Sequence, residues 1–168
     1  MHTFHPRAEV RLPSDSTVEV RRSFKAPRSL VWRTHTEPAL VQRWMLGPPG
    51  WTMPVCEMDV RAGGAYRWRW RGDDSGKEFG FHGEYKEVEA PAKIVQTEFF
   101  DPGDLGGDMG EGSLVTMTLD EHDGATTLTV LIDYFTKASR DAAVATGMTD
   151  GMEIGYQRLD AMFAEAPA

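Results

Sequence analysis

Residues 52–134 contain six strand-like segments in succession, separated only by turns and one glycine-rich loop. These segments are Thr52–Arg61, Ala65–Arg71, Phe79–Val88, Ile94–Phe100, Ser113–Asp120 and Thr126–Tyr134. Short connections join antiparallel neighbours, because a parallel pair needs a crossover of roughly a dozen residues or more. The segments therefore predict one antiparallel sheet, with Asp123-Gly124 as the turn of its last hairpin.

One more strand and three helices flank these segments. Thr17–Lys25 alternates as a strand does, and the side chains on its inward side are Val18, Val20, Arg22 and Phe24. Two short helices follow, and the second spans Glu37–Trp44. The final helix runs from Ser139 to about Glu165, and its apolar stripe comprises Met148, Met152, Gly155, Leu159 and Met162. We therefore expect an α+β fold, a curved antiparallel sheet of about seven strands wrapped on a long C-terminal helix, with two short helices after the first strand.

The 168 residues suit a single domain, which we place over residues 17–165 behind a flexible N-terminal arm of residues 1–16. The net charge of −8 disfavours a nucleic-acid partner. No apolar stretch approaches the roughly 20 residues of a membrane span, and the N-terminus lacks the apolar core of a secretory signal. With Cys56 as the only cysteine, these features predict a cytoplasmic protein.

Short motifs occur in a characteristic order over residues 17–165. They include Arg22-x-Phe24-x-Ala26-Pro27, Gly47-Pro48-x-Gly50-x-Thr52, Asp59-x-Arg61-x-Gly63-Gly64-x-Tyr66-Arg67, Gly83-Glu84-Tyr85-x-Glu87-Val88 and Gly151-x3-Gly155-Tyr156-x2-Leu159. The ordered set resembles the activator of heat-shock-protein-90 ATPase homologue group of the START-like (SRPBCC, polyketide cyclase and lipid transport) superfamily. The resemblance implies a helix-grip fold with a cavity between the sheet and the C-terminal helix.

Apolar side chains from both walls are the candidates for lining that cavity. On the strands they are Tyr66, Trp68, Trp70 and Phe81, and on the last helix they are Met148, Gly151, Met152, Gly155 and Leu159. For each aromatic ring the alternative is an ordinary core position. For the glycines, which fall four apart with Gly147, the alternatives are a close contact with the sheet or a helix broken near Thr149-Asp150.

Arg22 is a polar candidate for the pocket, because an inward charge on a strand is costly unless it is paired. Glu84 or Glu98 could pair with Arg22, and a ligand carboxylate is the alternative partner. The three arginines that alternate with the aromatic residues, Arg67, Arg69 and Arg71, predict a solvated outer face of the sheet.

The remaining polar residues predict no metal site and no cofactor. The five histidines do not cluster, and no His-x3-His or Cys-x2-Cys spacing occurs. The acidic residues of the loop over 101–112 do not follow the spacing of a calcium loop, so we expect that loop to be solvated and mobile.

The resemblance leaves three kinds of function open, and we expect the first. It is non-enzymatic binding of a small hydrophobic ligand that enters near the loop 101–112. The second is a polyketide cyclase or dehydratase-like enzyme with His82 and Glu84 as an acid–base pair in the same cavity. The third is a chaperone-linked or stress-linked interaction module.

The eukaryotic namesakes carry a separate N-terminal domain for which this chain has no room, so we do not expect a chaperone partner. A homodimer fits the family type, although no residue argues for one.

Overall fold

The computed structural model describes residues 3–103 and 112–165, and its largest element is an antiparallel sheet of eight strands. The strands are β1 (Glu9–Arg11), β2 (Thr17–Phe24), β3 (Trp51–Met58), β4 (Ala65–Gly72), β5 (Glu78–Glu89), β6 (Lys93–Asp101), β7 (Ser113–His122) and β8 (Ala125–Asp133). Their order across the sheet is β1-β2-β8-β7-β6-β5-β4-β3. The six consecutive strands therefore lie as a meander, as the short connections predicted, and β2 joins it beside β8.

Strand β1 is the one strand that the sequence analysis missed. It lies within the segment before residue 17, and Val10 faces Val20 of β2 in the register. Farther toward the N-terminus, the Ser23 amide donates a hydrogen bond to the His5 carbonyl oxygen at 2.8 Å. A strand of three residues carries too little periodicity to be recognised from the sequence.

Two short helices, α1 (Arg28–Thr36) and α2 (Pro38–Trp44), follow β2 as expected. Pro38 occupies the first position of α2, where its missing amide hydrogen leaves no helical bond unmade. The Trp44 indole donates a hydrogen bond to the Thr34 carbonyl oxygen at 2.7 Å, which fixes the two helices to each other.

The single long helix expected at the C-terminus is instead two helices, α3 (Lys137–Ala145) and α4 (Met148–Glu165). The chain breaks at Gly147, whose φ of +80° is open to glycine and costly for other residues. The break therefore lies just before the Thr149-Asp150 position that we had considered. Helix α3 begins after Thr136, whose hydroxyl accepts a hydrogen bond from the Ser139 amide at 3.1 Å.

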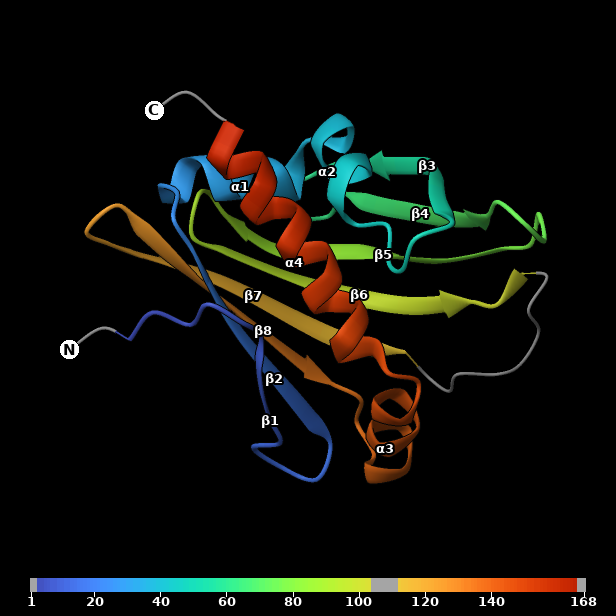
Figure 1. The fold of residues 1–168 in the computed structure, drawn as a ribbon. Helices are drawn as coiled ribbons and strands as arrows, with labels where there is room; N and C mark the ends of the chain where they lie inside the picture. The colour runs from blue at the N-terminus through green and yellow to red at the C-terminus, as the bar shows by residue number, and fades with distance from the viewer. Residues whose placement is uncertain (1–2, 104–111, 166–168) are drawn as a thin grey trace.

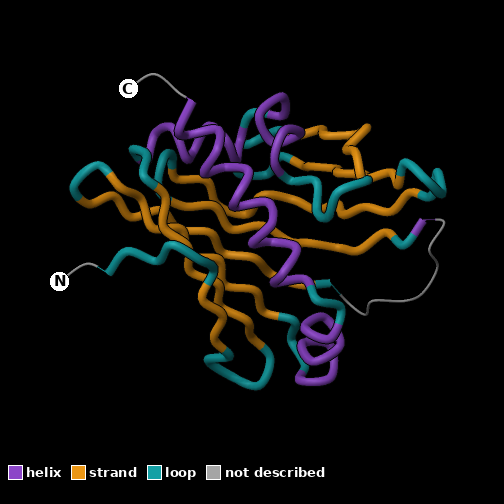
Figure 2. The backbone as a smooth tube through the Cα atoms, viewed as in Figure 1, coloured by secondary structure: helices purple, strands orange, loops and turns teal. Residues whose placement is uncertain are grey.

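Helix α4 lies obliquely across one face of the sheet (Figure 1). Its C-terminal half lies near α1 and α2 and its N-terminal end lies near α3, as the tube in Figure 2 also shows. The Phe24 and Tyr156 rings meet edge to face with centroids 5.6 Å apart, and Leu159 is completely buried. Burying a leucine side chain stabilises a fold by about 1.5–3 kcal/mol, so this half of α4 is held firmly on the sheet.

Candidate functional site

A cavity of about 830 Å³ lies between α4 and the sheet. Its wall consists of residues from β3 to β8, from all four helices and from the segment that follows α2. Ligand sites in proteins enclose about 300–1,000 Å³, so the cavity is large enough for a small organic molecule.

Aromatic rings form the wall of the cavity on the side of β4 and β5. Trp68, Trp70 and Phe81, three of the predicted residues, line it. They do so because β4 pairs with β5 in a register that places Trp68 opposite Phe81. The Trp70 and Phe81 ring centroids are 5.8 Å apart, and Phe100 of β6 continues the wall 5.4 Å from Phe81. Phe100 also lines the cavity, although the sequence analysis did not single it out.

Two of the predicted lining residues lie in the packed core. Tyr66 is buried, and its hydroxyl donates a hydrogen bond to the Thr97 carbonyl oxygen at 2.6 Å. Leu159 is one turn beyond the cavity on α4, where it is completely buried. For Tyr66 the structure therefore corresponds to the ordinary core position that was the alternative for the aromatic rings.

The helical wall of the cavity comes from the N-terminal half of α4. Met148, Gly151, Met152 and Gly155, four of the predicted residues, all line it. Apart from the backbone of its own helix and its chain neighbours, a Cβ atom added at Gly151 would have no heavy atom of the described residues within 4 Å, whereas one added at Gly155 would lie 3.2 Å from the Trp44 ring. Gly151 therefore leaves open volume, and Gly155 allows a close contact with Trp44.

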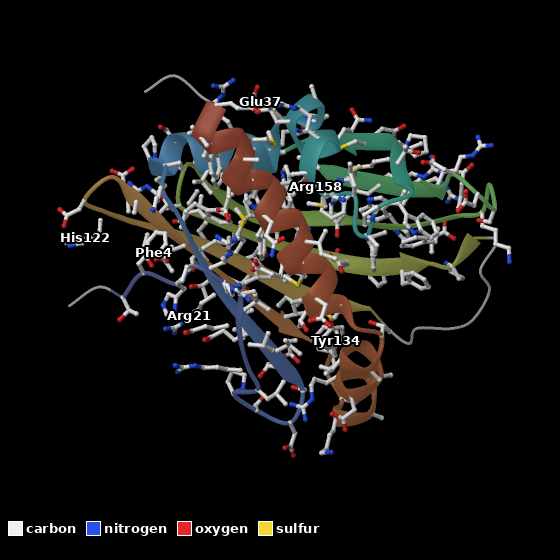
Figure 3. All side chains as sticks on the ribbon, viewed as in Figure 1. Phe4, Arg21, Glu37, His122, Tyr134 and Arg158 are labelled. Atoms are coloured by element: carbon white, nitrogen blue, oxygen red, sulfur yellow. The ribbon has the colours of Figure 1, made fainter. Side chains whose placement is uncertain are left out.

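One end of the cavity is marked by Tyr134, whose hydroxyl donates a hydrogen bond to the Met148 sulfur at 3.1 Å. In Figure 3 Tyr134 lies beside the start of α4, and Arg158 lies farther along that helix. Arg158 donates to the Gly47 carbonyl oxygen at 2.7 Å, which holds the segment after α2 against α4. Both ends of the cavity-forming part of α4 are thus fixed by side-chain contacts.

Arg22 is not among the residues that line this cavity, and its partners are not those that we expected. Its side chain is 2% exposed and binds Glu153 (Nε to Oε1, 3.1 Å) and Asp160 (Nη2 to Oδ2, 2.6 Å), both on α4. The pairing with Glu84 or Glu98 was therefore wrong. The two carboxylates raise the pKa of Arg22 against the opposing effect of burial. This cluster is a structural ion pair that holds α4 to β2.

Glu98 is a cavity residue that the sequence analysis did not place there. The side chains that β6 directs inward are Ile94, Gln96, Glu98 and Phe100, and all four line the cavity. Within the described part of the chain, the Glu98 carboxylate makes no hydrogen bond or ion pair. Its desolvation raises the pKa of the carboxyl group to about 7. The alternation of Ile94–Phe100 was visible in the sequence and could have revealed this position.

Two further polar atoms are buried in the cavity wall. His35 has its Nδ1 atom 2.9 Å from the Val31 carbonyl oxygen, so Nδ1 carries the hydrogen and Nε2 is an acceptor. Burial lowers the pKa of His35 to about 4, and the ring is therefore neutral at physiological pH. His35 Nε2 and Trp68 Nε1 have no hydrogen-bond partner among the residues that the structure describes.

The acid–base pair proposed for an enzyme does not form in the cavity. His82 and Glu84 are both exposed, and His82 stacks on Phe99 with ring centroids 5.5 Å apart. The register places His82 opposite Arg67, which is on the outer face of the sheet. This catalytic hypothesis was therefore wrong.

The outer face carries the three arginines of β4. Arg67 and Arg71 are exposed, as expected of a solvated face. Arg69 is less exposed and pairs with Glu78 at 3.2 Å and with Asp101 at 2.7 Å. Its charge is therefore already matched within the sheet.

The described residues contain neither a cluster of metal ligands nor a membrane-spanning helix. Over residues 3–103 and 112–165, no three His, Cys, Asp or Glu side chains come together as metal ligands. The same residues contain no helix of the length and apolarity needed to cross a bilayer. Asp104, Asp108 and Glu111 of the acidic loop, and most of the expected ligand entrance, lie outside the described residues.

Solved structures share this architecture over nearly the whole chain. A protein from Rhodobacter sphaeroides is 32% identical with a TM-score of 0.87, over 95% of this chain and 99% of that one. A protein from Mycobacterium smegmatis is 23% identical with a TM-score of 0.83, over 97% of this chain and all of that one. An AHSA1-like protein from Aeromonas hydrophila is 18% identical with a TM-score of 0.68, over 89% of this chain and 97% of that one.

The comparison with curated proteins found no match. A family model, described as Activator of Hsp90 ATPase homolog 1-like protein, matches residues 25–164. That range contains α1, α2, α3, every strand from β3 to β8 and all of α4 except its last residue, and so includes every described residue that lines the cavity. The chain belongs to the Activator of Hsp90 ATPase homolog 1-like protein family.

Proposed function

We propose that this protein binds a small hydrophobic molecule in the cavity between α4 and the sheet, without catalysis. The observation that carries the proposal is the cavity itself, about 830 Å³ in volume and walled by Trp68, Trp70, Phe81 and Phe100. A well-packed interior has few voids larger than a water molecule, so a space of this size is unusual unless it is occupied in use.

The helical side of the cavity supports the same proposal. Gly151 leaves open volume where a larger residue would fill the space. Met148 and Met152 lie on the same stretch of α4, and methionine side chains adapt to apolar surfaces of different shape. Each methylene group that a ligand buries contributes about 0.8 kcal/mol, so a medium-length alkyl chain would supply enough free energy for binding.

The hydrogen-bond partners of the hydroxyl groups around the cavity favour binding over catalysis. The Tyr134 hydroxyl donates to the Met148 sulfur, and the Thr146 hydroxyl donates to the Ala143 carbonyl oxygen. Among the described residues, no hydroxyl in the cavity wall is hydrogen-bonded to a histidine or a carboxylate that could activate it as a nucleophile.

The test is a titration with Nile red, a neutral dye that fluoresces in apolar surroundings. We expect the wild-type protein to bind the dye and Gly151→Leu to weaken binding about tenfold or more, because the leucine side chain would occupy the cavity. Ala161→Leu is the matched control, since Ala161 is exposed on the same helix. No dye binding by the wild-type protein, or equal binding by all three proteins, would contradict the proposal.

A further inference from the structure

The side chains that line the cavity carry charge of only one sign. Among the described lining residues, Glu98 is the one acidic side chain, and no lysine or arginine is present. The single histidine, His35, is neutral because burial lowers its pKa to about 4. The nearby Tyr66 and Tyr134 hydroxyls are neutral as well, because burial raises the pKa of each.

The Glu98 carboxylate also has capacity to accept hydrogen bonds. It makes none among the described residues, although an ionised carboxylate can accept several. Its neighbours on the inward face of β6 are Gln96 and Phe100, and its cross-strand partner on β7 is Ser113. A partly buried carboxylate without a partner is costly, so a group that supplies a positive charge would be stabilised there.

We infer that the cavity selects apolar molecules that carry a protonated amine, with the ammonium group bound by Glu98 and the apolar part against the aromatic wall. The inference rests on the proposed function and specifies the class of its ligand. The Trp68 and Trp70 rings strengthen the preference, because an ammonium group is attracted to the face of an indole ring. The same carboxylate disfavours fatty acids, since like charges repel across an apolar space.

The experiment compares three ligands of equal chain length, decylammonium, decanol and decanoate, by displacement of Nile red. It is run at about pH 8.5, where Glu98 is ionised and an alkylamine is still protonated. Salt at about 0.15 M screens the overall negative charge of the protein. We expect decylammonium to bind at least about tenfold more tightly than decanol, and decanoate to bind more weakly than decanol.

Two variants then test whether Glu98 is the charge that causes the preference for decylammonium. Glu98→Gln should remove the tenfold preference for decylammonium over decanol. Glu84→Gln, on the outer face, changes the net charge of the protein equally and should keep the preference.

The outcomes separate this inference from the proposed function. If the three ligands displace Nile red equally from the wild-type protein, the inference is wrong and the proposed function stands. That comparison needs no variant, so it remains decisive if Glu98→Gln does not fold. If Nile red and all three ligands fail to bind, both the inference and the proposed function are wrong.

Discussion

Arg22 and Glu98 both occupy inward positions on their strands, and they differ in what surrounds the charge. Arg22 is enclosed by Glu153 and Asp160 and also donates to the Ser23 carbonyl oxygen. Glu98 lines a cavity and has no such partner among the described residues. The first arrangement stabilises the fold, and the second retains a polar group where a ligand could reach it.

Replacing Arg22 tests its structural role. We expect Arg22→Met to lower the free energy of unfolding by about 3 kcal/mol, because it leaves two carboxylates without their cation. The value belongs at the lower end of the range for buried pairs, since Asp160 is 46% exposed. Urea denaturation measures the loss, with Arg67→Met on the outer face as the control. An equal effect of both substitutions would contradict the structural role of Arg22.

Glu98 should make the stability of the protein depend on pH. Its pKa rises from an ordinary value of 4.5 to about 7 in the folded state, so the native protein holds the proton more tightly than the unfolded chain. The contribution of Glu98 to the unfolding free energy should therefore be highest below about pH 4.5, fall as pH rises toward 7, and level off above that. One unit of pKa corresponds to 1.36 kcal/mol, so the full fall is about 3 kcal/mol.

Glu98→Gln should abolish this fall in the unfolding free energy with rising pH. The measurement is the difference in unfolding free energy between variant and wild type, which should grow in favour of the variant between about pH 5 and pH 8. The low pKa of His35 also affects stability in acid, but it is present in both proteins and cancels in the difference. A difference that does not change with pH would contradict the placement of Glu98.

At the scale of elements, the glycines of α4 show how one residue type serves two purposes. Gly151→Ala should stabilise the protein by about 0.5–1 kcal/mol, because alanine favours the helix and nothing lies within 4 Å of the new atom. Gly155→Ala should give no such gain, because its Cβ would lie 3.2 Å from the Trp44 ring and 3.3 Å from the Trp44 carbonyl oxygen. Thermal unfolding of both variants checks the contrast, and equal shifts would contradict it.

The same helix shows where sequence patterns are informative. Met148, Met152 and Gly155 of the predicted stripe line the cavity and Leu159 and Met162 do not, because helical periodicity gives the face of a helix but not how far along it a cavity extends. The separation of α3 from α4 was only one of the alternatives for the glycines, since glycine occurs both within helices and at their ends. Whether the chain continues as one helix through Gly147 depends on how α3 packs, and a local sequence pattern does not show that packing.

At the scale of the whole molecule, the architecture could be predicted and the partners of individual charges could not. Six alternating segments and one final helical region were enough to predict an antiparallel sheet covered by a helix. Arg22, by contrast, binds residues 131 and 138 positions away along the chain. Such a pairing depends on how α4 is placed over β2, which the order of elements does not fix.

Which aromatic residues line the cavity could not be predicted from the sequence either, for a related reason. Tyr66 alternates with Trp68 and Trp70 and was predicted to line the same space. In the folded chain its hydroxyl binds Thr97, so its ring belongs to the core. The position of the helix over the sheet thus decides which side chains on one face of a strand lie in the core and which line the cavity.

The aromatic wall of the cavity has a spectroscopic consequence. Four of the five tryptophans, Trp44, Trp51, Trp68 and Trp70, line the cavity. Indole emission responds to the polarity and mobility of whatever touches the ring, and here nearly all of the emitting groups touch the same space. The protein therefore carries an intrinsic optical reporter, so that an entering molecule would change the wavelength or intensity of its ultraviolet emission without any added label.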